Sequence, residues 1–156
     1  MKIHPSLLRG IAASVAFATL VGCAAEPTPE IANAAAAPLM DTSWKLTKLG
    51  DEVVSTPTGA REINLVLQAR NQRVTGFAGC NLMTGSYLLA GNEIRFEPMG
   101  STRMACEGRM EIEQRYLAMF AGASRWEITA TNLRLLDTAG KTVATFEAQP
   151  VKQDSP

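Results

Sequence analysis

The chain has a single histidine, His4, among its 156 residues. His4 belongs to an N-terminal segment that we expect to be removed from the mature protein. Without imidazole, Ser-His-Asp and Cys-His nucleophile systems are excluded, as are zinc sites that depend on histidine. A phosphate-binding loop is also missing, because the glycines of residues 76–85 lack the lysine and the helix start that such a loop needs.

The chain also has no excess of positive or negative charge. Fifteen Lys and Arg residues balance fifteen Asp and Glu residues, and loss of Lys2 and Arg9 would leave thirteen basic residues. Nucleic acid is therefore not an expected partner. Glu107, Glu111 and Glu113 are close in sequence and could in principle form a catalytic pair. Glu107 and Glu111 are four residues apart, and a solvated helix face explains them better than a catalytic pair. We predict no catalytic residue, no metal and no cofactor.

The longest apolar run, residues 11–21, is too short to span a membrane as a helix. It follows a short basic start, as in a secretory signal peptide. Its end, Leu20-Val21-Gly22-Cys23, resembles the lipobox of bacterial lipoproteins, which implies cleavage before Cys23 and acylation of that residue. Ala24, in place of Asp, resembles the sorting pattern for the outer membrane. An ordinary signal peptide with a chance cysteine is the alternative.

Composition divides the chain into four parts. Residues 1–22 are the predicted signal peptide, and residues 23–42 are a lipidated tether rich in Ala and Pro, without hydrophobic periodicity. Residues 43–148 are the predicted folded domain, and residues 149–156 are a polar tail.

The folded part has mainly the period of strands. Ile63, Leu65 and Leu67 alternate with polar or smaller residues, and similar short runs are separated by turn residues. Residues 109–121 instead have helical spacing, and Gly122 stands at a C-cap position. We predict an α+β domain, mostly antiparallel: a highly curved sheet or partly open barrel of short strands with one covering helix.

Several motifs resemble those of the META domain, HslJ type. They are Trp44-x-Leu46, Gly76-Phe77-Ala78-Gly79-Cys80-Asn81, Gly85-Ser86-Tyr87, Ser101-Thr102-Arg103-Met104-Ala105-Cys106 and Glu113-x-x-Tyr116. The resemblance implies an envelope or secreted domain, often lipid-anchored and sometimes associated with heat or envelope stress, with no agreed enzymatic reaction. It marks six residues as a structural motif: Gly79, Asn81, Gly85, Thr102, Met104 and Ala105.

Cys80 and Cys106 are the remaining reactive residues. In an exported protein such an even pair is usually a disulfide. Closing a loop of this length stabilises by about 3 to 4 kcal/mol. A redox-active pair is the alternative, although the spacing is not that of a C-x-x-C site. Asn81 is expected to bond the local backbone, as Asn does in turns.

These observations predict a non-catalytic, lipid-anchored envelope protein. It would be held at the outer membrane, facing the periplasm, and would bind a protein or a cell-wall component under stress. The alternative is an inhibitor or chaperone-like lipoprotein acting on a defined envelope enzyme, and a thiol-redox protein is a further one. An exposed apolar patch beside the Cys80–Asn81 loop would favour binding, whereas a deep polar pocket with convergent carboxylates would favour catalysis.

Overall fold

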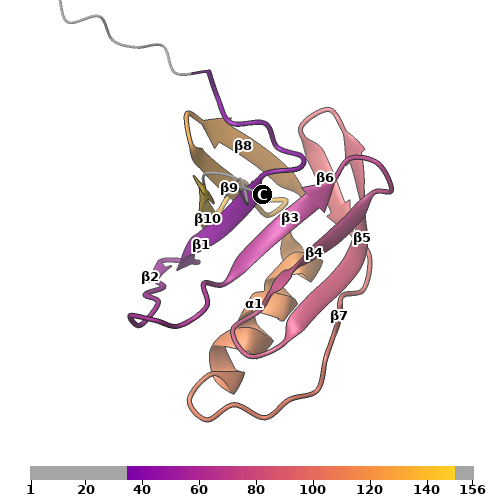
Figure 1. The fold of residues 1–156 in the computed structure, drawn as a ribbon. Coiled ribbons are helices and arrows are strands. Elements are labelled where there is room, and N and C mark those ends of the chain that lie inside the picture. Colours follow the sequence, from indigo (N-terminus) through magenta and orange to yellow (C-terminus); the bar gives the residue numbers. More distant parts are fainter. Residues whose placement is uncertain (1–34, 150–156) are drawn as a thin grey trace, which may run out of the picture. The chain divides into compact units, whose positions relative to one another are not determined.

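The computed structural model describes residues 35–149, which form a ring of antiparallel strands with one helix (Figure 1). The predicted signal peptide, Cys23, most of the tether and residues 150–156 lie outside the described residues. The elements are β1 (Ser43–Leu49), β2 (Glu52–Val53), β3 (Asn64–Gln68), β4 (Arg73–Phe77), β5 (Leu82–Ala90), β6 (Glu93–Phe96), β7 (Gly100–Ser101), α1 (Met110–Gly122), β8 (Arg125–Thr129), β9 (Asn132–Leu136) and β10 (Thr142–Gln149).

The sheet closes on itself. Its strand order is β10-β9-β8-β6-β5-β4-β3-β1, and β10 also pairs with β1. The join between β6 and β8 is the shortest in the ring, with the single ladder pair Glu93–Arg125. β2 and β7 attach to β1 and β5 respectively, outside this ring. The predicted fold class is confirmed, with a closed sheet in place of a partly open one.

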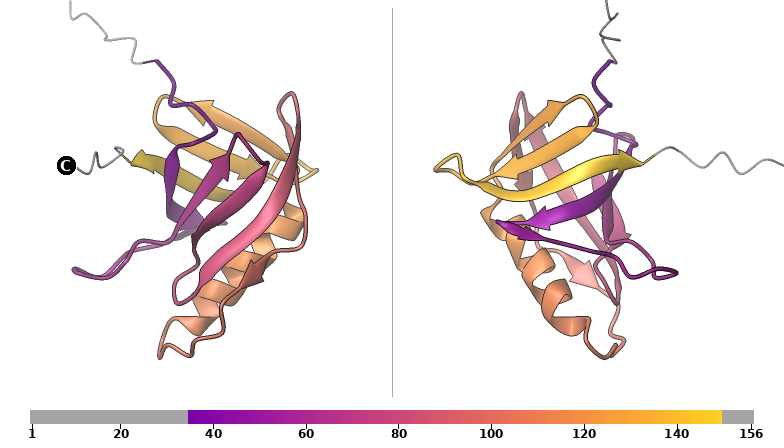
Figure 2. Two further views of the ribbon diagram at one scale, coloured as in Figure 1. Left: turned by 45° about the vertical axis from the view of Figure 1, so that its right-hand side comes forward. Right: turned by 90° about the vertical axis from the view of Figure 1, so that its left-hand side faces the viewer.

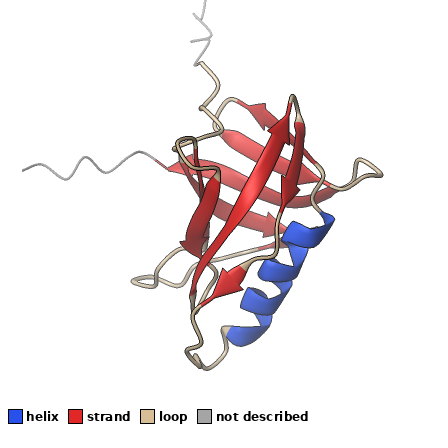
Figure 3. Cartoon of the chain, turned by 90° about the vertical axis from the view of Figure 1, so that its right-hand side faces the viewer, coloured by secondary structure: helices blue, strands red, loops and turns tan. Residues whose placement is uncertain are grey.

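Alternating burial along the strands builds the core. On β3, Leu65 and Leu67 are fully buried while Val66 between them is only half-buried. Helix α1 covers one side of the sheet, as Figures 2 and 3 show. Its Phe120 ring packs edge-on against Phe96 of β6, at 4.8 Å between centroids.

The end of α1 differs from the expectation. Gly122 is the last helical residue, and the C-cap is Ala123, in an extended conformation with φ −73° and ψ 127°. A left-handed glycine cap is not needed here, because the chain passes straight from Ala123 into β8. Among the described residues, no helix is long and apolar enough to cross a membrane.

The packed domain begins before residue 43. Leu39 is buried in the core, and the Trp44 indole Nε1 donates to its carbonyl at 2.9 Å. The Ala37 amide donates to the Ala130 carbonyl at 2.9 Å. The predicted tether of residues 23–42 is therefore too long at its C-terminal end, because Leu39 packs in the core and the segment around it is hydrogen-bonded to the domain. At the other end of the domain, Gln149 belongs to β10 and not to a polar tail.

Candidate functional site

A disulfide joins the turn after β4 to the segment before α1. Cys80 and Cys106 are bonded, with their Cα atoms 5.7 Å apart. The predicted disulfide is confirmed. Cys80 is buried, so solvent reaches little of its side chain.

The glycines near Cys80 have two separate roles. The turn itself is short, with the Ala78 amide donating to the Asn81 carbonyl at 2.8 Å, and Gly79 has φ +124°, which disfavours other residues. Gly85 lies inside β5, opposite Val74, where a Cβ would collide with Met99. Gly85 therefore lies within a strand and not in the turn, and a side chain there would require Met99 to move.

A buried carboxylate accepts hydrogen bonds from this turn. Glu113 of α1 is only 4% exposed. Its Oε2 accepts from the backbone amides of Cys80 at 3.0 Å and Asn81 at 2.7 Å, and its Oε1 accepts from Asn81 Nδ2 at 2.8 Å. Glu113 is therefore not a solvated carboxylate: the three donors replace the water that it loses on burial.

The Asn81 side chain binds a distant segment as well as Glu113. Its Oδ1 accepts from Thr102 Oγ1 at 2.8 Å and from the Met104 amide at 2.7 Å, while Nδ2 also donates to the Met104 carbonyl at 3.1 Å. The expected local bonding is wrong: the carboxamide mimics a peptide group and pairs with Met104 as a neighbouring strand would. Ala105 is exposed beside this contact, just before Cys106.

The sequence did contain a signal for the role of Glu113. This residue shares a helical line with apolar residues, Met110, Leu117 and Phe120. A carboxylate at such a position must find donors inside the protein. Nothing in the sequence, however, identified Asn81 as a residue that donates to Glu113.

Exposed apolar side chains lie next to this network. Leu82, which follows Asn81, is 50% exposed, and Met104 is 62% exposed. Leu82 pairs across the strands with Phe77, and the Arg61 guanidinium lies over the Phe77 ring at 4.7 Å from its centroid. We call Arg61, Phe77, Leu82 and Met104 the Leu82 surface. Leu82 and Met104 are its exposed apolar members, one on each side of the Asn81 side chain's contacts.

A shallow hollow adjoins the Leu82 surface on the outer face of β3, β4 and β5. Its volume is about 390 Å³, and its lining includes Arg61, Val66, Thr75, Leu82 and Thr84. Hydroxyl, apolar and cationic groups are mixed there, and no carboxylate lines it.

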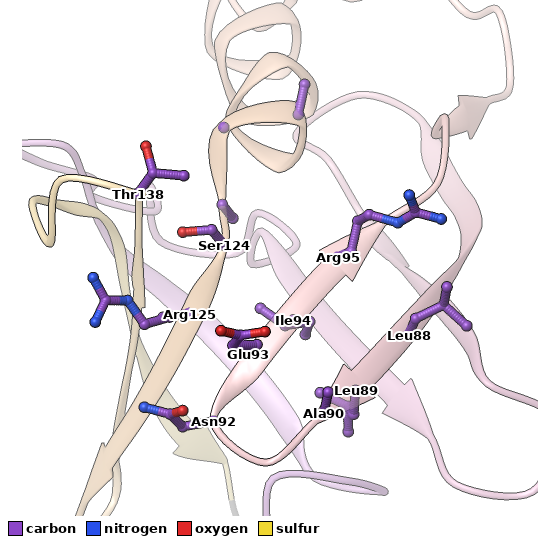
Figure 4. Close-up of a pocket in the computed structure, with 13 residues that line it drawn as sticks. Leu88, Leu89, Ala90, Asn92, Glu93, Ile94, Arg95, Ser124, Arg125 and Thr138 are labelled. Carbon is purple, nitrogen blue, oxygen red and sulfur yellow. The ribbon is translucent and has the colours of Figure 1, made fainter.

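A larger hollow of about 690 Å³ lies where β6, β8 and the end of α1 meet (Figure 4). Glu93 is the sole carboxylate among its lining residues, and the cations Arg95 and Arg125 also line it. Convergent carboxylates, which would favour catalysis, are not found in this hollow.

Tyr116, of the Glu113-x-x-Tyr116 motif, is fully buried in the core. Among the described residues its hydroxyl has no hydrogen-bond partner. Burial raises the pKa of the Tyr116 phenol well above its ordinary value. The phenol is therefore neutral at physiological pH and acts in packing.

Comparison with known proteins agrees with this arrangement. The family model for the META domain matches residues 37–150. The chain belongs to the META domain family. The match begins at Ala37, where packing against the core also begins.

Two solved structures resemble this META domain. An NMR structure of a protein from Burkholderia xenovorans is 31% identical, with a TM-score of 0.60, covering 71% of this chain and 83% of that one. A second NMR structure is 19% identical, with a TM-score of 0.55, covering 70% and 90%. No curated protein matches the chain.

Proposed function

We propose that this META-domain protein is a non-catalytic binding module of the cell envelope, anchored through acyl chains on Cys23. The observation that carries the binding role is the Leu82 surface. Arginine, methionine and aromatic residues are enriched at the cores of protein interfaces, and this surface consists of such residues with Leu82 and without Lys, Asp or Glu.

Rigidity supports the same proposal. The disulfide, the Glu113 carboxylate and the Asn81 carboxamide all hold the backbone next to Leu82 and Met104. A surface that is already ordered loses less conformational entropy on binding.

A non-catalytic role is supported by the chemistry of the described residues. The buried carboxylate of Glu113 is occupied by three donors from the Cys80–Asn81 turn. The proposed outer-membrane location, with the domain facing the periplasm, rests on the resemblance of Leu20–Ala24 to the lipoprotein sorting pattern. The proposed link to heat or envelope stress rests on the resemblance to the META domain, HslJ type.

Site-directed photo-crosslinking in cells tests the binding role. A photoreactive residue at position 82 should give a discrete adduct with a partner. The control is position 53 on β2, where Val53 is 68% exposed and lies outside the Leu82 surface. Equal adducts at both positions, or none at position 82, would contradict the proposal.

A further inference from the structure

Residues 100–104 form an extended margin of the sheet, which includes β7. Figure 1 shows β7 beside β5. Three contacts, two residues apart, hold the inner edge of this segment: Gly100 pairs with Thr84, the Thr102 amide donates to the Leu82 carbonyl at 3.0 Å, and Met104 pairs with the Asn81 carboxamide. The spacing is that of a strand.

The outer edge of this segment is unpaired. Because Thr102 donates toward β5, the alternation of an antiparallel ladder directs the N–H and C=O groups of Ser101 and Arg103 away from β5. In the described part of the chain, β7 has no strand on its other side. Residues 100–105 are all exposed.

This edge is a template for an extended chain. Unpaired peptide groups on an ordered edge strand are the feature that strand addition uses. Many free edges are covered by a helix or a loop, whereas this one is exposed and is held in place by Asn81 and by the disulfide at Cys106.

The charge near this edge indicates which kind of chain would pair with it. Arg61, Arg103 and Arg109 are near this edge or at the Leu82 surface, and none forms an ion pair with another described residue. A second copy of the chain, paired antiparallel with Arg103 opposite Arg103, would set two like charges directly opposite each other, which destabilises a sheet.

We propose that residues 100–104 receive an extended, acidic segment of a partner protein by strand addition. The partner's backbone would pair with Ser101 and Arg103, its carboxylates would face Arg103, and its apolar side chains would contact Met104 and Leu82. This inference rests on the proposed binding function and specifies how binding occurs.

The test is an NMR titration of the full-length chain with a synthetic heptapeptide of alternating glutamate and valine. We expect saturable shifts of the Ser101 and Arg103 amides, and no saturable shift with the matching lysine–valine peptide. Two further acidic peptides distinguish strand addition from binding through the side chains alone. One is N-methylated at the odd-numbered residues and the other at the even-numbered residues. In strand addition, one of these two peptides should bind at least about tenfold more weakly and the other should bind normally. The reason is that only every second peptide group of an added strand faces the protein.

Substitutions on the protein side provide a second measurement. Ser101→Pro removes an outward N–H without changing charge, and should weaken binding about tenfold, whereas Ser101→Ala should not. If Ser101→Pro does not fold, the two N-methylated peptides still decide the question.

Three outcomes would overturn the inference. They are no saturable shift with the acidic peptide, equal binding of both N-methylated peptides, and peptide-free shifts at Ser101 that depend on protein concentration, which would indicate a second copy. A crosslink at position 82 with any of these results would leave the binding function standing and reject only strand addition.

Discussion

At the residue scale, Glu113 determines how the Cys80–Asn81 turn is held. Glu113→Gln keeps the shape of the side chain but places an NH₂ group against either the two backbone amides or Asn81 Nδ2. At least one donor then loses its acceptor, so we expect the free energy of unfolding to fall by about 1 to 3 kcal/mol in urea denaturation. Glu111→Gln, at an exposed position of the same helix, is the control and should change it by less than about 0.5 kcal/mol. Equal effects would show that the network contributes nothing.

Removal of the Tyr116 hydroxyl is expected not to lower the free energy of unfolding. It is buried without a partner, so Tyr116→Phe removes a polar group that has lost its water. The free energy of unfolding should stay unchanged or rise by up to about 1 kcal/mol. Tyr87→Phe is the matched comparison, because the Tyr87 hydroxyl donates to the Gln68 carbonyl at 3.0 Å, and its loss should cost about 1 kcal/mol. A larger loss for Tyr116→Phe than for Tyr87→Phe would reveal a partner for Tyr116.

At the element scale, the disulfide connects the β4–β5 turn to the start of α1. Changing both Cys80 and Cys106 to Ser should lower the free energy of unfolding by about 2 to 4 kcal/mol and keep the strand content, measured by circular dichroism. Reductant should destabilise the native protein similarly and leave the double variant unaffected. A stable, thiol-reactive reduced form would instead support a redox role.

Strands and helix were largely predictable, because their periodicity reflects which side chains face the core. Ile63, Leu65 and Leu67 alternate and are buried. The closure of the ring was not predictable, because the pairing of β10 with β1 joins residues about a hundred positions apart and no local pattern encodes it. The unpredicted β7 has only two residues, with its neighbour Thr102 held by Asn81, so it lacks any periodicity.

At the scale of the whole molecule, the domain begins at the segment around Leu39. Leu39→Ala removes a buried side chain that sequence composition had placed in the tether, and should lower the free energy of unfolding by about 2 kcal/mol or more. Met40→Ala is the neighbouring control, since Met40 is 40% exposed, and it should cost less than about 1 kcal/mol. Equal, small effects in thermal and urea unfolding would restore residue 43 as the start of the domain.

The predicted anchor limits where such a domain can act. Thirteen residues separate Cys23 from Ala37, and fully extended they would span at most about 45 Å. An acylated Cys23 would therefore keep Ala37 within about this distance of the membrane, and the proposed partner would have to reach the domain there. Cys23→Ser should abolish incorporation of a fatty-acid analogue and leave the protein unprocessed or released from the membrane fraction, because two or three acyl chains are needed for stable anchoring. Cys80→Ser with Cys106→Ser is the control and should keep the label, since those cysteines are bonded to each other. Equal labelling of the Cys23→Ser protein would refute the anchor, and the tether would then set no limit on the distance between the domain and the membrane.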